Sequence, residues 1–136
     1  MESNMSKMNQ ILTSLRYRYK QMENLMSLTK EMEKVISVND LESLSMVLNM
    51  RQEAMDRVDK INKEIDKTVS SLEPPYRDKI KQLLHQTGQP VQLDNPLETN
   101  IFDTNKITLQ LLKKIVDLDQ AVNDRIHKGA SGGTSG

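Results

Sequence analysis

The chain contains no cysteine and no tryptophan, and its 136 residues include only five glycines and four prolines. Without cysteine, disulfide bonds, thiolate zinc sites and cysteine nucleophiles are excluded. Aromatic residues make up 3% of the chain, fewer than a β-sandwich or a β-barrel normally uses. No apolar run approaches the ~20 residues that cross a bilayer, and the polar first ten residues lack the apolar core of a signal peptide. We expect a helical protein in the cytoplasm, without membrane insertion.

A charge excess of one sign is also missing, because 19 lysines and arginines balance 19 aspartates and glutamates. A neutral chain lacks the basic field that attracts nucleic acid. Arg16, Arg18 and Lys20 flank Tyr17 and Tyr19, a composition also found in small RNA-binding patches. A few basic residues in a neutral chain more often face solvent, so we expect no nucleic-acid partner.

Residues that perform catalysis or hold a metal are scarce. The two histidines are His85 and His127, and Asp124 lies three residues before His127, the spacing of a helical ligand pair. A metal site in a helical bundle normally needs several inward carboxylates. The chain has no glycine-rich phosphate loop, no Gly-x-Ser-x-Gly motif and no zinc-ligand spacing. We therefore expect no enzyme activity and no bound metal or cofactor.

Three interruptions divide the chain into segments. We expect Asn39 to cap the start of a helix, because Glu42 follows three residues later as in a capping box. The pair Pro74-Pro75 ends one helix and begins the next within its first turn. Residues 87–96 contain a glycine, two prolines and several turn residues, which predicts a loop.

Between these interruptions, apolar residues recur at steps of three and four, as in amphipathic helices. The pattern predicts helices at about 7–37, 41–72, 76–85 and 97–127. The short connection between the first two makes them antiparallel neighbours. The expected fold class is all-α: a long antiparallel helical hairpin, a short helix and a long C-terminal helix, in a three- to four-helix bundle or coiled coil. Residues 1–128 form one domain, and the glycine- and serine-rich residues 129–136 are expected to be a flexible linker or tag remnant.

The second long segment carries a heptad seam, which we expect to pack against the first helix. Two of its positions are polar, and an isoleucine beside the second of them covers the seam there. The seam residues are Leu41, Leu44, Leu48, Arg51, Met55, Val58, Asn62, Ile65, Val69 and Leu72.

The last helix has an apolar face wider than one hairpin can cover. On a helical wheel its apolar residues span roughly 220°, against ~100° for an ordinary surface helix. Either Ile107, Leu111 and Leu118 or Phe102, Leu109 and Val116 form the free edge, and the pattern does not decide between them. The predicted partner-binding residues of this helix are Ile101, Phe102, Ile107, Leu109, Leu111, Leu112, Ile115, Val116, Leu118 and Val122.

Methionine is abundant, with nine residues in the chain, several of them in the two long helices of the hairpin. Methionine is typical of loosely packed bundle cores and also of surfaces that accommodate varied apolar partners. Met46 and Met50 lie one turn apart and off the heptad seam, so we add them to the predicted partner-binding residues. Excess apolar surface is covered either by self-association, for example as a homodimer, or by an amphipathic helix of another protein.

The segment from Asn39 to Ile65, NDLESLSMVLNMRQEAMDRVDKINKEI, follows a long helix and resembles the FlgN family of flagellar export chaperones and the related FliT-type chaperones. The stretch from Leu111 to Ile126, LLKKIVDLDQAVNDRI, is similar to the last helix of that family. The matching positions are Asn39, Asp40, Leu41, Leu44, Leu48, Arg51 and Gln52 in the first stretch and Leu118, Asp119 and Asn123 in the second.

This resemblance implies a cytoplasmic chaperone of flagellar type III secretion. FlgN-like members bind the C-terminal helical segments of the hook-associated proteins FlgK and FlgL, and FliT-like members bind the filament cap protein. They prevent premature assembly and deliver their cargo to the export apparatus, and the last helix of the family takes part in substrate binding. The resemblance leaves the choice between the two types open.

Two other interpretations compete with the chaperone. The stronger is a self-assembling coiled-coil scaffold or interaction module, and the weaker is a nucleic-acid-binding or metal-binding bundle. The segment 87–96 favours a bundle that folds back on itself, because a coiled-coil scaffold rarely interrupts its seam with a proline-containing loop and then resumes with a wider apolar face.

Overall fold

The computed structural model describes residues 3–85 and 89–135, with side chains as far as residue 126. These residues form helices and no strand, so the chain is an all-α helical bundle, as the apolar periodicity predicts. Within this part of the chain, no helix is both long enough and apolar enough to cross a membrane. The helices are α1 (Asn4–Ser37), α2 (Leu41–Ser70), α3 (Pro74–Leu84) and α4 (Pro96–Ser135).

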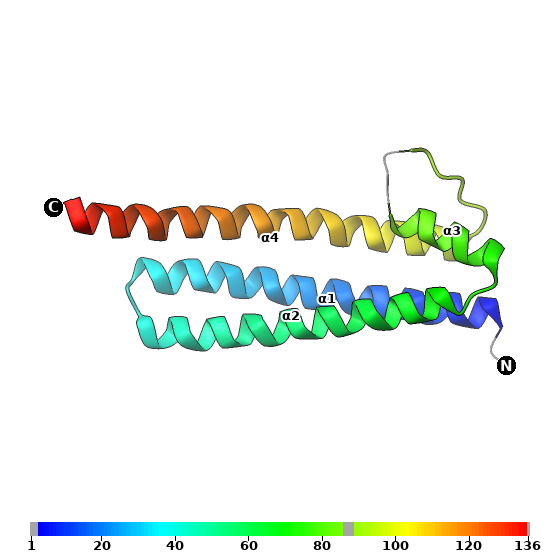
Figure 1. The fold of residues 1–136 in the computed structure, drawn as a ribbon, viewed down its shortest axis with the longest axis horizontal. Coiled ribbons are helices and arrows are strands. Elements are labelled where there is room, and N and C mark those ends of the chain that lie inside the picture. The colour runs from blue at the N-terminus through cyan, green and yellow to red at the C-terminus, as the bar shows by residue number, and fades with distance from the viewer. Residues whose placement is uncertain (1–2, 86–88, 136) are drawn as a thin grey trace.

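The three long helices lie side by side with α1 in the middle (Figure 1). Helix α2 returns antiparallel to α1, which confirms the predicted hairpin, and α4 runs parallel to α1 along its other side. Helices α2 and α4 each pack along α1 and scarcely contact each other. The short α3 packs on α2 and α4 at the end of the molecule where α4 begins.

The turn between α1 and α2 differs from the expectation at one residue. Asn39 does not cap α2; it takes a left-handed conformation with φ 57°, which asparagine tolerates better than most residues. Its amide donates to Ile36 O and that of Asp40 to Val35 O, the two bonds that close a helix C-terminus in a Schellman motif. Asp40 is the cap of α2 and accepts from the Ser43 amide at 3.1 Å. Hydrogen bonds from the hydroxyl and amide of Ser43 lower the pKa of the Asp40 carboxyl.

Helix α3 begins with Pro74 and Pro75 in its first turn, as predicted. Proline has no amide proton, and the first turn of a helix needs none. Helix α3 starts two residues before its predicted bound at residue 76, at the first of the prolines.

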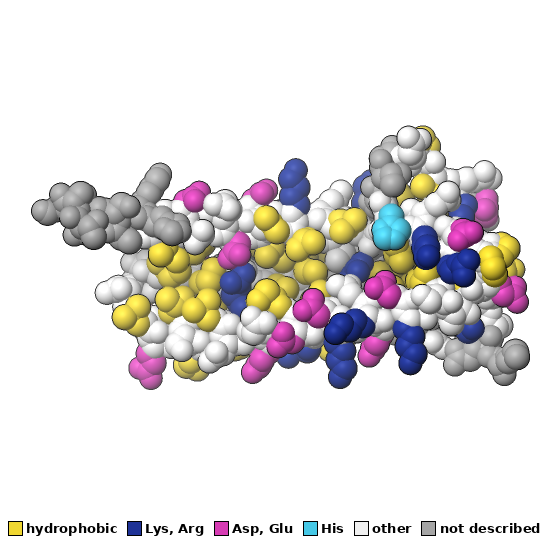
Figure 2. Space-filling model, viewed as in Figure 1, with side chains coloured by type: hydrophobic (Ala, Val, Ile, Leu, Met, Phe, Trp, Pro, Cys, Tyr) yellow, Lys and Arg dark blue, Asp and Glu magenta, His cyan; other side chains and the backbone are white. Residues whose placement is uncertain are grey.

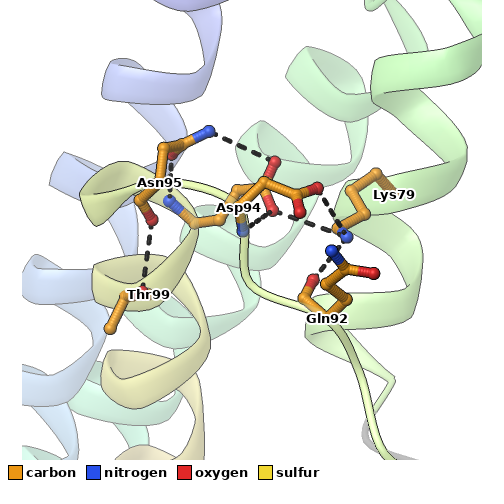
Figure 3. A network of polar contacts seen from close by, with 6 residues as sticks. Lys79, Gln92, Asp94, Asn95 and Thr99 are labelled. Carbon is orange, nitrogen blue, oxygen red and sulfur yellow. Dashed lines mark hydrogen bonds and ion pairs between the residues drawn. The ribbon is translucent and has the colours of Figure 1, made fainter.

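The connection from α3 to α4 is held by Lys79 (Figure 3). The Lys79 ammonium donates to the Gln92 carbonyl and pairs with Asp94 at 3.3 Å and with the buried Glu98 at 3.5 Å. Asn95 caps α4 by accepting from the Glu98 amide at 2.9 Å. Residues 89–95 lie outside any helix, in agreement with the loop predicted at 87–96, whose last residue, Pro96, begins α4. Residues 87 and 88 of the predicted loop lie outside the described part of the chain.

Two apolar clusters form the core, one at each end of the bundle. The cluster at the α3 end draws on all four helices, and the other draws on α1, α2 and α4. The first contains Met8, Ile11, Leu12, Leu15, Ile61, Ile65, Val69, Leu72, Ile80, Leu83 and Ile101, and the second contains Met22, Leu25, Leu28, Met32, Val47, Ala54, Val58, Ile115 and Val122.

The predicted heptad seam of α2 is wrong over the first half of that helix. Leu41, Leu48 and Met55 are exposed, and the residues buried against α1 are Val47 and Ala54 instead. Leu44 stays partly buried against the second cluster, whereas Leu48 and Met55 lie beside the interface with α1, and the small side chain of Ala54 occupies a buried position. From Val58 onward the seam is buried as expected, apart from its partly buried polar member Asn62.

Helix α4 continues beyond its predicted end, to Ser135. The side chains of residues 129–136, where the sequence predicts a flexible linker or tag remnant, lie outside the described part of the chain. That interpretation stays a prediction.

Replacing one leucine in the core and one on the exposed side of α2 tests this arrangement. Leu15→Ala removes a fully buried side chain and should lower the free energy of unfolding by about 3 kcal/mol, as in other leucine-to-alanine changes in cores. Leu48→Ala should change it by less than about 1 kcal/mol, because Leu48 is exposed and alanine favours the helix. Urea unfolding followed by circular dichroism measures both, and equal losses would contradict the exposed position of Leu48.

Candidate helix-binding groove

A groove runs between α2 and α4 on the side of the bundle where these two helices do not meet. Its floor is α1 and its walls are α2 and α4, and Figure 2 shows hydrophobic side chains gathered in a band between the two walls. We call it the α2–α4 groove. Its middle section is lined by Met22, Leu25, Arg51, Gln52, Met55, Val58, Asp59, Asn62, Leu112, Ile115, Val116 and Asp119.

The middle section continues in both directions. Toward the α1–α2 turn it shares Val116 and Asp119 with a hollow that reaches Met32 and Ile126. Toward α3 it shares Asn62 with a more polar hollow. From Leu112 to Ile126 the apolar part of the groove is about 20 Å long, since a helix rises ~1.5 Å per residue.

Both walls of the groove keep apolar side chains exposed. Leu112 is 38% exposed and Val116 56% exposed on α4, and Leu48 and Met55 are exposed on the facing side of α2. Each wall helix buries one stripe of side chains on α1 and turns the adjacent stripe toward the groove. The groove is therefore an apolar surface that no other part of the described chain covers.

An ion pair crosses the floor of the groove. Arg51 on α2 bonds Asp119 on α4 with 3.2 Å between Nη2 and Oδ1, and its Nη1 lies 3.6 Å from the sulfur of Met32 on α1. The Arg51 side chain is 12% exposed, whereas that of Asp119 is 48% exposed. This pair ties α2 to α4 and leaves the aspartate on the solvent side.

A polar layer closes the groove at the α3 end. Arg18 of α1 donates to Asn62 of α2 at 2.8 Å and to Asn105 of α4 at 2.6 Å, and Asn105 donates to the Leu84 carbonyl at the end of α3. Burial lowers the pKa of the Arg18 guanidinium, and the charge of Asp66 partly opposes that shift. This layer separates the two apolar clusters and joins all four helices.

The structure distributes the predicted partner-binding residues of α4 over different environments. Ile101, Ile115 and Val122 are buried in the core of the bundle. The partly buried members are Phe102, which packs on the first cluster, and Leu111 and Leu118, which pack on the second. The exposed members are Ile107, Leu109, Leu112 and Val116.

Each of the two edges of α4 considered from the sequence contains both exposed and partly buried residues. Leu112 and Val116 line the middle of the groove, and Leu109 lines its polar end. Ile107 is 44% exposed, but the helical period places it on the opposite edge of α4. The binding role of these residues stays a prediction.

Met46 and Met50 are exposed, but they do not line the groove. With about 100° per residue, they fall on the other side of the buried stripe of α2 from Leu48 and Met55. Of the residues that line the middle section, sequence analysis assigned Leu112, Ile115 and Val116 to the site and missed the rest, among them Met55, Asp59 and Asp119. A signal for Met55 was present, because it belongs to the same predicted seam as Leu48.

The candidate metal and nucleic-acid residues lie apart from the groove. Among the residues that the structure describes, no three histidine, aspartate or glutamate side chains are grouped as metal ligands, and the His127 side chain is not described. Arg16, Lys20 and Tyr17 are exposed, whereas Arg18 turns inward to the polar layer. The three basic residues therefore do not form one surface patch.

Comparison with known proteins finds no matching family model, no matching curated protein and no matching solved structure. The groove and its residues are thus the basis on which a function has to be argued.

Replacing Arg18 tests the importance of the polar layer. Arg18→Met keeps the length of the side chain but leaves the oxygens of Asn62 and Asn105 without a donor, and should lower the free energy of unfolding by about 1–3 kcal/mol. Arg16→Met, at an exposed position on the same helix, should change it by no more than about 0.5 kcal/mol. Urea titrations of both variants make the comparison; similar values for the two would show that the layer adds nothing to stability.

Proposed function

We propose that this protein is a cytoplasmic, non-enzymatic chaperone of the FlgN or FliT type, which covers an apolar helical segment of a flagellar hook-associated protein and delivers it for export. The α2–α4 groove is the observation that supports this proposal most strongly. It offers exposed leucine, methionine and valine side chains on two helical walls, as a site for an amphipathic helix does.

The position of α3 supports a helix as the occupant of the groove. Helix α3 packs on both α2 and α4 and buries Ile80 and Leu83 between them, so it fills the fourth position of the bundle over its own 11 residues. Beyond α3 no other residue that the structure describes takes this position, although α1, α2 and α4 continue. A helix bound there would extend the four-helix arrangement along the rest of the bundle.

The shape of the groove suits a cargo that must later be released. Unassembled axial proteins have apolar heptad ends that would pair with one another, and a chaperone protects them by covering that face. The groove is open along one side, and the Arg51–Asp119 pair interrupts its apolar lining. Both features limit the buried apolar area and favour moderate affinity, because hydrophobic stabilisation scales with the area removed from water.

A complex with a natural cargo fragment tests the proposal directly. The protein is mixed with C-terminal fragments of the two hook–filament junction proteins and of the filament cap protein from the same organism, and run on size-exclusion chromatography with light scattering. A defined complex with one fragment is expected and would identify the cargo. A homo-oligomer that grows with concentration and binds no fragment would instead support the self-assembling scaffold.

Charged substitutions in the groove should abolish that complex. Leu112→Glu with Val116→Glu places two carboxylates on the apolar wall of α4, and we expect at least about a hundredfold weaker binding, because both charges would have to be desolvated. Helix content should stay unchanged, since both positions are exposed. Circular dichroism measures helix content and isothermal titration calorimetry measures affinity.

Two further variants show whether a loss of binding is specific to the groove. The matched control, Gln110→Glu with Lys114→Glu, places the same side chains at exposed positions away from the groove on α4 and should bind normally. Ile107→Glu tests the other edge of the helix. Binding lost in Ile107→Glu and kept in the Leu112/Val116 variant would move the cargo site to that edge and refute the groove as the binding surface.

A further inference from the structure

In the middle of the α2–α4 groove, the acidic side chains are more exposed than the basic one. Asp59 on α2 is exposed and forms no ion pair or hydrogen bond with any described residue. Asp119 on α4 is half exposed and is paired only with Arg51 in the described part of the chain. Arg51, the one basic residue among those that line this section, is 12% exposed and is paired with Asp119. A ligand in the middle of the groove therefore meets negative charge from both walls.

The other end of the groove carries charge of the opposite sign. Lys81 and the mostly buried Arg18 line the polar hollow beside α3, together with Asp66 and His85. The middle section is bounded by Asp59 and Asp119, with Met55, Leu112 and Val116 between them. The two acidic groups thus flank the apolar surface that a bound helix would cover.

We propose that the groove selects an amphipathic helix that directs a lysine or arginine from its apolar face toward Asp59 and Asp119. This inference rests on the proposed function, because it describes the cargo segment of the same site. The long aliphatic stem of a basic side chain packs on Met55 and Val116, and its positive charge is attracted by both carboxylates, which lie at opposite ends of this section about 14 Å apart along the bundle. The residues three and four positions to either side of the basic residue are apolar and contact the walls.

The two carboxylates discriminate most strongly against an acidic residue at that position. Like charges brought together as a groove loses water cost more than opposite charges gain, because both groups lose their hydration. The Arg51–Asp119 pair therefore acts as a specificity determinant: it holds the Asp119 carboxylate in place, and the guanidinium is already occupied by that carboxylate.

Three synthetic peptides that differ at one residue test this selectivity. Each is a fluorescein-labelled amphipathic helix of about 21 residues with leucine at the seam positions, long enough to span the apolar part of the groove. The central seam residue is lysine, glutamine or glutamate. Fluorescence anisotropy against the intact chain should show that the lysine peptide binds at least about tenfold more tightly than the glutamate peptide, with glutamine between them.

Variants of Asp59 and Asp119 test whether the preference for the lysine peptide arises from these two side chains. In Asp59→Asn with Asp119→Asn the lysine and glutamate peptides should bind within about twofold of each other. Since Asp119→Asn also removes the partner of Arg51, Asp59→Asn alone is measured too and should reduce the preference by about half on a logarithmic scale. The matched control, Asp103→Asn with Asp117→Asn, neutralises two exposed acidic residues outside the groove and should retain the full preference.

Each other result overturns the proposal. Equal affinities for the three peptides would mean that the aspartates do not select, and a preference unchanged in the Asp59 variants would place binding elsewhere. No binding of any peptide, or a homodimer that excludes them, would mean that the groove does not receive such a helix. The experiment uses no flagellar protein, so a lysine preference without any flagellar complex would reject the flagellar assignment and keep the selectivity.

Discussion

Helix α1 is the element on which the rest of the bundle depends, because it buries side chains against α2 on one side and α4 on the other. Its neighbours scarcely contact each other, so nearly all of their apolar contact is made through α1. Because α2 and α4 both pack on α1 and not on each other, the side chains next to their buried stripes face a common space. The α2–α4 groove is the direct result of this geometry, and only α3 fills part of it.

The polar layer around Arg18 gives this arrangement its register. Apolar side chains alone tolerate sliding of one helix along another, since leucine, isoleucine and methionine replace each other at modest cost. A guanidinium that bonds asparagines on two neighbouring helices cannot slide without losing both bonds in a region of low exposure. The layer therefore sets how α2 and α4 are aligned, and with them the positions of Arg51 and Asp119, which lie farther along the same two helices.

Much of the fold follows from local patterns in the sequence, and the details of the site do not. The all-α class, the hairpin and the start of α3 at the proline pair were predictable because apolar steps of three and four and the chemistry of proline act over a few residues. Which side of α2 is buried was not, because the small side chain of Ala54 takes a buried position that a count of large apolar residues ignores. Likewise, the wide apolar face of α4 indicated uncovered surface, but which edge is free depends on where α1 and α2 lie in space.

The distance in sequence between α1 and α4 also indicates the order in which the helices of this molecule assemble. The α1–α2 hairpin joins segments that are neighbours in the sequence, and such contacts form early because little chain entropy is lost in closing a short loop. Helix α4 is separated from α1 in the sequence by α2, α3 and the loop held by Lys79, so a long stretch of chain must be closed before the two helices meet. We therefore expect the second wall of the groove to be added last, so that a complete binding surface forms only once α4 has docked on α1.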